Sequence, residues 1–273
     1  YTIKVKVKDT NNIESSEYQI TAKTDDTVLL ADYIKSKYTS QGSNGLYYHT
    51  SSLANSAGDN SYRYAGANPN NYVCFGSDAA TCPSANLYRI IGVFGNEVKL
   101  IKSTSYGRYA WDSGRDNTWS SSDIKNTLNT TYLNSLSSTW QNKIANHTWY
   151  VGGHTTSSAT PKEFYNAESS GTTWSGKIGL MYVSDYGYAA SNNYWTTDMY
   201  DYDGGTYNSD WMHLGSTEWT ISRRSDGTTS AFHVYSAGYV SNYSVSNSNA
   251  VRPSFYLTSS TSYVSGSGTS ADP

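Results

Sequence analysis

The sequence predicts a mixed α+β protein whose antiparallel strands are joined by long ordered loops. Short segments alternate apolar and polar residues, two of them flank a Gly95-Asn96 turn, and other stretches space their apolar residues as a helix does. Hydrophobic residues make up only 37% of the 273, but aromatic residues reach 15% and the net charge is −3. Disordered chains combine few aromatics with high net charge. We therefore expect a folded chain whose core is built largely from Tyr and Trp.

The charge balance and hydropathy exclude two classes of partner. Nucleic-acid binding calls for a basic stripe, which a chain with 19 basic and 22 acidic residues does not provide. No apolar run approaches the roughly 18 residues of a membrane span, so we expect no direct membrane insertion. The chain begins inside a strand pattern, and we expect it to be part of a longer protein.

Residues 1–24 are predicted to form a β-hairpin. Apolar and Lys residues alternate in YTIKVKVK, a turn follows at Asp9-Thr10-Asn11-Asn12, and YQITA continues the pattern. This segment resembles the last two strands of immunoglobulin-like or cadherin-like modules. The resemblance implies a domain boundary after residue 24.

Residues 25–85 are expected to be a helix and a loop-rich connector that packs on the main domain, residues 86–273. Asp25-Asp26-Thr27 offers an N-cap for a helix over VLLADYIKSKY. Residues 39–72 are predicted to form ordered loops with a short strand or two, and their tyrosines are expected to anchor these loops. Cys74 and Cys82 have a spacing that suits a disulfide around a small loop in an oxidising setting, with two free thiols as the alternative.

The main domain begins with a hairpin in LYRIIGVFGNEVKLIKS. Ser121-Ser122-Asp123 is expected to cap a helix, and a second helix is expected from Thr139. Strands are predicted in TWYVGG (148–153), in KIGLMYVSDYGYA (177–189) and in the apolar segments 219–222 and 251–257, with a long loop over 190–218. Most of the tryptophans should be buried, because aliphatic residues are few.

Taken in order, these segments resemble one family. YRIIGVFGNEVKLIKS, YAWDS, NTWSSSDIKNTLNTTYLNSL, WYVGG, KIGLMYVSDYGYA, WTIS and AVRPSFYL are similar to the C-type-lectin-like domain of bacterial and phage surface proteins. That fold is shared with formylglycine-generating enzymes and with the variable proteins of diversity-generating retroelements. The resemblance covers about residues 86–258. It implies a twisted antiparallel sheet, two helices, long ordered loops and a ligand face in the C-terminal stretch.

Two departures from the family limit what the resemblance implies. Formylglycine-generating enzymes need a C-terminal cysteine pair, and no cysteine follows Cys82. Calcium-dependent lectins use motifs such as EPN or QPD, and neither occurs. No His, Ser or carboxylate stands in a catalytic motif either, and Glu163, Glu168, Asp185 and Glu218 are expected to be solvated or capping. We therefore expect no enzyme.

The expected ligand face lies in the stretch Trp219–Leu257, whose two ends should be buried strands. Tyr offers contact area at low entropic cost, and Ser and Asn offer adaptable hydrogen bonds. The residues expected to bind ligand are His233, Tyr235, Tyr239, Ser241, Asn242, Tyr243, Ser244 and Asn247. Arg223 and Arg224 are also expected to contact the ligand, if it is acidic. A salt bridge at the rim of the face is an equally good interpretation of this pair. Arg252 is expected to form a buried ion pair.

One candidate metal site stands in the loop before this stretch. Asp198, Asp201 and Asp203 precede Gly204-Gly205 and could offer oxygen ligands to calcium. The terminal Glu of an EF-hand loop is absent, and the alternative is a solvated turn. No cofactor other than this possible calcium ion is expected.

These observations predict an extracellular binding or adhesion module at a cell or virion surface, with a cell-surface protein or glycan of a host or bacterium as partner. Adenine-directed mutagenesis of Asn codons can produce many of the residue types expected to contact the ligand. A further hypothesis is therefore that the chain is a diversified variable protein. The alternatives are a lectin or carbohydrate-active enzyme, and a structural cap of a surface fibre that binds nothing.

Overall fold

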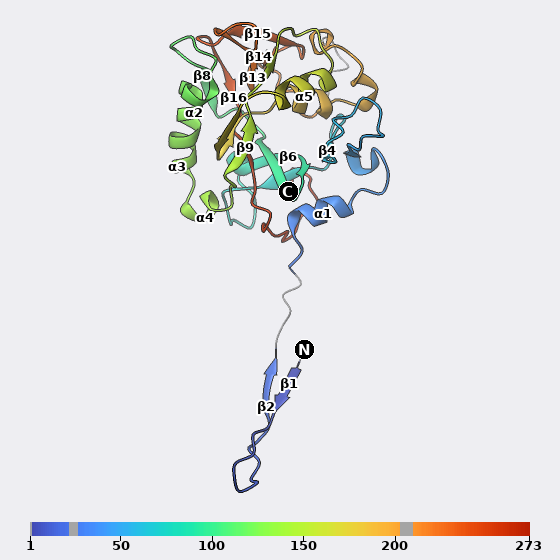
Figure 1. Ribbon diagram of the computed structural model, residues 1–273, viewed down its shortest axis with the longest axis vertical. Coiled ribbons are helices and arrows are strands. Elements are labelled where there is room, and N and C mark those ends of the chain that lie inside the picture. The colour runs from blue at the N-terminus through green and yellow to red at the C-terminus, as the bar shows by residue number, and fades with distance from the viewer. Residues whose placement is uncertain (1, 22–26, 203–209) are drawn as a thin grey trace.

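The computed structural model describes residues 2–21, 27–202 and 210–273 of a mixed α+β chain with mostly antiparallel sheets (Figure 1). Strands β1 (Thr2–Val5) and β2 (Tyr18–Thr21) pair antiparallel as a two-stranded sheet. The predicted N-terminal hairpin is therefore present. Its connection turns where the Asn12 amide donates to the Asp9 carbonyl.

The first large sheet has seven strands within the described residues, six of them in the order β12-β17-β7-β6-β4-β3, while β5 also pairs with β6. Their bounds are β3 Leu46–Tyr48, β4 Tyr62–Tyr64, β5 Tyr72–Cys74, β6 Leu87–Phe94, β7 Glu97–Lys102, β12 Ile178–Gly179 and β17 Ser254–Tyr256. The hairpin predicted around Gly95-Asn96 is confirmed as β6 and β7. Because β3, β4 and β5 belong to this sheet, the boundary expected at residue 86 falls inside it.

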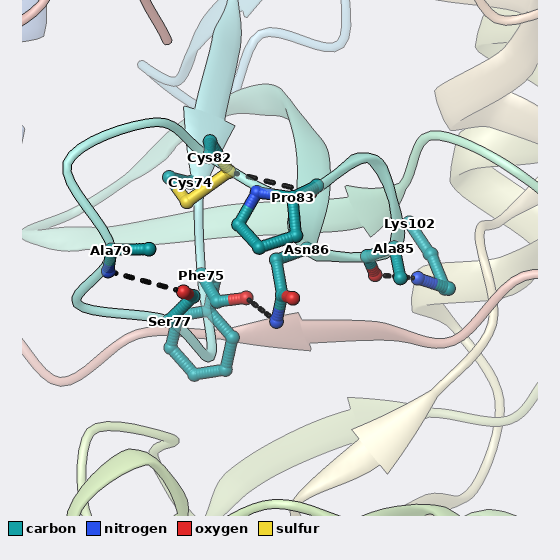
Figure 2. Close-up of a disulfide and its surroundings, with 9 residues drawn as sticks. All are labelled: Cys74, Phe75, Ser77, Ala79, Cys82, Pro83, Ala85, Asn86 and Lys102. Atoms are coloured by element: carbon teal, nitrogen blue, oxygen red, sulfur yellow. Dashed lines mark hydrogen bonds between the residues drawn. A yellow bond between two sulfur atoms is a disulfide. The ribbon is translucent and has the colours of Figure 1, made fainter.

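A disulfide joins Cys74, the last residue of β5, to Cys82, as the spacing predicted (Figure 2). Next to it, Phe75 is buried against the rings of Tyr88, Trp140 and Phe255. The Asn86 side chain donates to the Phe75 carbonyl at 3.0 Å. The bridge closes the loop between β5 and β6 over this aromatic anchor.

The second large sheet has six strands within the described residues, in the order β15-β14-β13-β16-β8, with β10 also paired to β13. Their bounds are β8 Gly107–Ala110, β10 Gly153–His154, β13 Glu218–Arg224, β14 Ser230–Val234, β15 Val240–Ser244 and β16 Ser248–Val251. Strands β13, β14 and β15 run antiparallel, whereas β16 and β10 are parallel to β13. A small sheet pairs β9 (His147–Tyr150) with β11 (Thr173–Gly176).

The predicted helices are present, but shorter or less regular than expected. Helix α1 spans Leu30–Ser36, and α2 (Asp123–Thr127) continues through a π-helical turn, Leu128–Tyr132, into α3 (Leu133–Ser135). The Ser122 hydroxyl caps α2 by accepting from the Lys125 amide. The second predicted helix is only α4, Ser138–Gln141.

The strand predicted over residues 177–189 is wrong beyond its start. After β12 the chain forms helix α6, Val183–Ala189, whose residues are all buried. A helix enclosed on every side has no polar face, so its apolar periodicity resembles that of a buried strand. Gly187 lets α6 approach closely, because a Cβ there would lie 2.6 Å from Pro161.

Helix α5, Pro161–Ser169, was not predicted, although its sequence carries a start signal. Thr160 and Glu163 form a capping box, and Pro161 occupies the first helical position. The chain thus has more helices than the two that the family resemblance implies. Glu163 and Asp185 cap as expected, Asp185 by accepting from the Tyr182 amide at the start of α6, although Asp185 is buried. Glu168 and Glu218 are also buried and not solvated.

A buried charge network ties α6 to the first large sheet. Asp185 on α6 accepts from the Lys99 ammonium of β7 at 2.5 Å and from the Arg63 guanidinium of β4 at 3.3 Å. Arg63 also pairs with Asp59 at 2.7 Å. Around this network the core is aromatic. Most of the eight tryptophans are buried, as predicted: Trp111, Trp119, Trp149, Trp195, Trp211 and Trp219.

A second buried ion pair stands where the chain crosses from one large sheet to the other. Val251 ends β16 and Ser254 begins β17, so Arg252 is part of the two-residue link between the sheets. Its guanidinium donates to both carboxylate oxygens of Glu218, at 2.7 and 2.9 Å, and to the Met212 carbonyl at 2.6 Å. This is the buried pair that the sequence predicted for Arg252.

Replacing Arg252 by Met should lower the free energy of unfolding by about 3–5 kcal/mol, because the Glu218 carboxylate would be left buried without its cation. Urea denaturation measures this loss. The double variant Arg252→Met/Glu218→Leu should recover much of it, since neither charge remains. Arg224→Met, which removes an exposed pair with Asp226, is the matched control and should change little. A double variant as unstable as the single one would contradict this account.

Candidate recognition site

A hollow of about 550 Å³ opens on one face of the second large sheet, and we call it the recognition hollow. Its walls come from β8, β14, β15 and β16 and from the turns that join them. It is lined by Arg108, Thr217, His233, Tyr235, Tyr239, Ser241, Asn242, Tyr243, Asn247, Ser248 and Asn249. Its volume lies within the range of typical ligand sites, roughly 300–1,000 Å³.

Strand alternation explains why these side chains converge. His233 pairs with Ser241 across the β14–β15 ladder and with Trp219 across the β13–β14 ladder. Directly paired residues point to the same face of a sheet. The alternate residues Phe232 and Val234 are fully or almost fully buried on the other face. One side of β14 therefore packs on the core and the other faces the hollow, beside Ser241 and Tyr243 of β15.

The β14–β15 turn fixes the aromatic edge of the hollow. The Tyr235 amide donates to the Tyr239 carbonyl, and the Gly238 amide donates to the Tyr235 carbonyl, both at 2.8 Å. Gly238 has a φ of 105°, a conformation that side-chain-bearing residues rarely adopt. The Tyr186 hydroxyl, from α6, donates to the Gly238 carbonyl. These bonds bring the Tyr235 and Tyr239 rings into a stack with centroids 4.9 Å apart.

Two polar side chains of the lining are buried without a hydrogen-bond partner among the described residues. They are His233, through Nδ1, and Asn249, through Nδ2. Both residues are almost completely buried, at 4% and 3% exposed. An unpaired buried polar atom typically costs about 1–3 kcal/mol, so each such atom in a native structure needs an explanation. A ligand in the hollow that bonds to these atoms would supply one.

The rim combines exposed rings with small polar groups. Tyr243 is 50% exposed and Tyr235 is 41% exposed, and both rings lie near His233, with centroids 5.6 and 6.3 Å away. Arg108 is held at the opposite edge, where its guanidinium donates to the Ser248 carbonyl at 2.8 Å. The rings provide flat contact area, and the amides and hydroxyls can donate or accept hydrogen bonds.

The hollow carries little charge at neutral pH. Burial lowers the pKa of His233 to about 4, so its imidazole is uncharged. The lining includes no carboxylate among the described residues, and Arg108 is its charged side chain. The electrostatics favour an uncharged ligand that forms many hydrogen bonds.

Seven of the residues predicted to bind ligand meet in this hollow, and three lie elsewhere. Ser244 bonds to the Ser246 hydroxyl at 3.0 Å. Arg223 lies toward the far end of β13, beside Gly153, and Arg224 makes two bonds to Asp226, which agrees with the alternative of a rim salt bridge.

Four lining residues are not among those predicted from the sequence. Ser248 and Asn249 lie inside the predicted stretch Trp219–Leu257, where their residue types match those of the predicted contacts. Thr217 precedes β13, and Arg108 comes from β8, more than a hundred residues earlier in the chain. A local sequence pattern cannot reveal that β8 pairs with β16.

The described members of the proposed calcium site, Asp198 and Asp201, do not line this hollow. Asp198 precedes a 3-10 turn, Met199–Asp201, whose last residue is Asp201, and Asp203 lies outside the described residues. In the part of the chain that is described, no group of three or more His, Cys, Asp or Glu side chains could hold a metal ion. The calcium site stays a prediction.

Comparison with known proteins adds no assignment: no family model, no curated protein and no solved structure matches the chain. The C-type-lectin-like resemblance therefore stays a prediction. Among the described helices, none has the length and apolar character needed to cross a membrane.

Asn249→Leu should leave the free energy of unfolding unchanged or raise it by about 1 kcal/mol, because it removes a buried amide nitrogen that has no partner. Thermal and urea denaturation measure the change. Asn117→Leu is the matched control, since the Asn117 amide donates to three carbonyls, those of Arg224, Gly227 and Ser230. The control should lose more than about 2 kcal/mol. An equal loss in Asn249→Leu would show that Nδ2 is satisfied after all.

Proposed function

We propose that this chain is an extracellular recognition module that binds its ligand in the recognition hollow. The observation that carries the proposal is the pair of unpartnered buried polar atoms, His233 Nδ1 and Asn249 Nδ2, in a hollow rimmed by exposed tyrosines. A surface that serves only as structure gains nothing from unpaired buried polar atoms. Sites that bind ligands commonly accept such a cost in stability.

An uncharged glycan is the ligand class that best fits the hollow. Stacked tyrosyl rings, amides and hydroxyls provide both flat surfaces and hydrogen bonds, and no carboxylate or buried cation lines the described walls. The volume equals that of roughly eighteen liquid water molecules, which gives room for a ligand of about disaccharide size. Such a glycan would be displayed on a host or bacterial cell.

The disulfide supports the extracellular setting, because such bridges form and persist in oxidising compartments. We further propose that the face is diversified. Seven of the eleven lining residues lie in the segment from Tyr239 to Asn249, so mutagenesis of one short gene segment would change more than half of the site. A reverse transcriptase and a template repeat beside the gene would support this idea, and the absence of both would leave an adhesin of fixed sequence.

The proposal predicts that the full chain binds uncharged glycans on an array that also carries sialylated and sulfated ones. For a bound glycan, Tyr243→Ala and Tyr235→Ala should each weaken the affinity at least about tenfold, because exposed tyrosines often dominate binding. Surface plasmon resonance measures the dissociation constants. Asn249→Leu should also weaken binding while the fold stays stable.

Tyr150→Ala is the matched control, because Tyr150 is 46% exposed and lies outside the recognition hollow. Its affinity for the glycan should equal that of the unmodified chain. Selective binding of acidic glycans would overturn the ligand class. An array without any bound glycan would favour a protein ligand or a structural cap, and Tyr243→Ala with unchanged affinity would move the site elsewhere.

A further inference from the structure

A second hollow, of about 180 Å³, lies between α5, α6 and the first large sheet, and we call it the acid hollow. Its walls are mostly aromatic and its inner part is charged. It is lined by Asp59, Arg63, Phe94, His147, Tyr150, Tyr165, Glu168, Ser169, Tyr182, Ser184, Asp185 and Tyr256. None of these residues belongs to the recognition hollow. Its volume corresponds to roughly six liquid water molecules, so only a small ligand fits.

Glu168 on α5 has one carboxylate oxygen without a partner in this hollow. Oε1 accepts from the Val183 amide at 3.0 Å and from the Ser222 hydroxyl, which fixes the side chain. Oε2 is buried and has no hydrogen-bond partner among the described residues. Glu168 is only 3% exposed, so bulk water does not solvate this oxygen freely.

The charges around the acid hollow are paired, except for Glu168. Arg63 and Lys99 are matched by Asp59 and Asp185 in the ion pairs of the buried network. No cationic side chain of the described residues lies within 4 Å of the Glu168 carboxylate. When Glu168 is ionised, the hollow therefore lacks one positive charge.

The rings of the hollow differ in whether they already face a cation. Arg63 lies near Phe94 and Tyr165, and Lys99 lies near Tyr182 and Tyr256, each within 6 Å of the ring centroid. Tyr150, at the mouth and 46% exposed, faces no cation of the described chain at this range. Its ring is available to a cation that enters from solvent.

We propose that the acid hollow binds a small primary ammonium ion, whose nitrogen donates to Glu168 Oε2 and whose alkyl part, which carries part of the positive charge beside the nitrogen, lies against the ring of Tyr150. The ammonium group provides both the missing charge and the missing hydrogen-bond donor. The apolar walls accept a short alkyl chain. This site is independent of glycan recognition, and either proposal can fail without the other.

The protonation of Glu168 gives the site a pH dependence with a defined sign. Burial is the main cause that raises its pKa to about 7, and Asp185 raises it further, while bonds from Ser184 and Ser222 oppose the shift. The other titratable or charged groups that interact with Glu168 are Lys99, Tyr182 and Tyr188. Above pH 7 the carboxylate is charged and binds the cation. Below pH 7 a proton competes.

Asp59, a second carboxylate of the lining, keeps its charge across this range. The Arg63 guanidinium and the hydrogen bonds of Ser61 hold the pKa of Asp59 at about 2, despite burial, so Asp59 stays ionised. Burial lowers the pKa of His147 below its ordinary value, while the hydrogen bond and the charge of Glu97 oppose this shift. Affinity should therefore fall about tenfold from pH 8 to pH 6, following the ionised fraction of Glu168.

Propylammonium chloride is the probe, and 1-propanol is its uncharged counterpart. Titration of the full chain, followed by calorimetry or by NMR shifts, should show saturable binding of propylammonium in roughly the millimolar range at pH 8. Glu168→Gln should abolish most of this binding and its pH dependence. Tyr150→Leu should weaken it several-fold, whereas Tyr243→Leu, at the recognition hollow, should leave it unchanged.

Thermal denaturation of Glu168→Gln provides a second measurement, which checks the titration itself. Because the pKa of Glu168 is raised in the folded state, its contribution to stability is present below the ordinary value of about 4.5 and is lost as the pH rises through 7. The melting temperature of the variant, relative to the unmodified chain, should therefore rise between pH 5 and pH 8.

Four results would overturn the proposal: no saturable binding of propylammonium, 1-propanol binding equally well, affinity that rises toward pH 6, or full binding by Glu168→Gln. If Glu168→Gln does not fold, the loss of affinity in Tyr150→Leu and the pH profile of the unmodified chain decide the question. In that case, full affinity of Tyr150→Leu for propylammonium, or an affinity of the unmodified chain that does not change with pH, contradicts the proposal.

Discussion

The Arg252–Glu218 ion pair is the interaction on which the two-sheet architecture depends. Glu218 is the first residue of β13 and pairs in register with Ala250 of β16 and Val234 of β14. Arg252 follows β16 directly and leads into β17 of the other sheet. One buried contact thus fixes where β13 starts, where β16 ends and where the chain changes sheets. A buried pair adds little net stability, but an unpaired member is strongly unfavourable, so the pair specifies this one arrangement.

The recognition hollow is a consequence of that arrangement. Its inner polar groups stand on β14 and β16, the two strands that the start of β13 holds in register. The core face of the same sheet is closely packed, for example where the Phe232 ring meets Phe164 of α5. A rigid apolar side therefore supports a polar side whose hydrogen bonds are incomplete. This division is what a preorganised binding surface requires.

The sequence predicted local features and failed where contacts are long-range. Short sequence patterns predicted five features: the β6–β7 hairpin, the Ser122 cap, the disulfide, the buried tryptophans and the Arg252 ion pair. Helix α6 was predicted as a strand, because burial on every side removes the polar face that distinguishes a helix from a strand. Most of the recognition hollow was predicted because one hairpin and the following turn provide it. The contribution of Arg108 and the whole acid hollow could not be predicted, since their residues meet only when distant elements pair.

The most direct test of the central claim is an NMR measurement of the Asn249 side-chain amide in the full chain, labelled with ¹⁵N, with and without a glycan that binds. This NH₂ signal should shift on binding, because its nitrogen acquires the hydrogen-bond partner that it lacks in the unbound chain. The Asn117 amide, already bonded to three carbonyls, should not shift. An unchanged Asn249 signal at saturation with the glycan would contradict the assignment of the recognition hollow as the binding site.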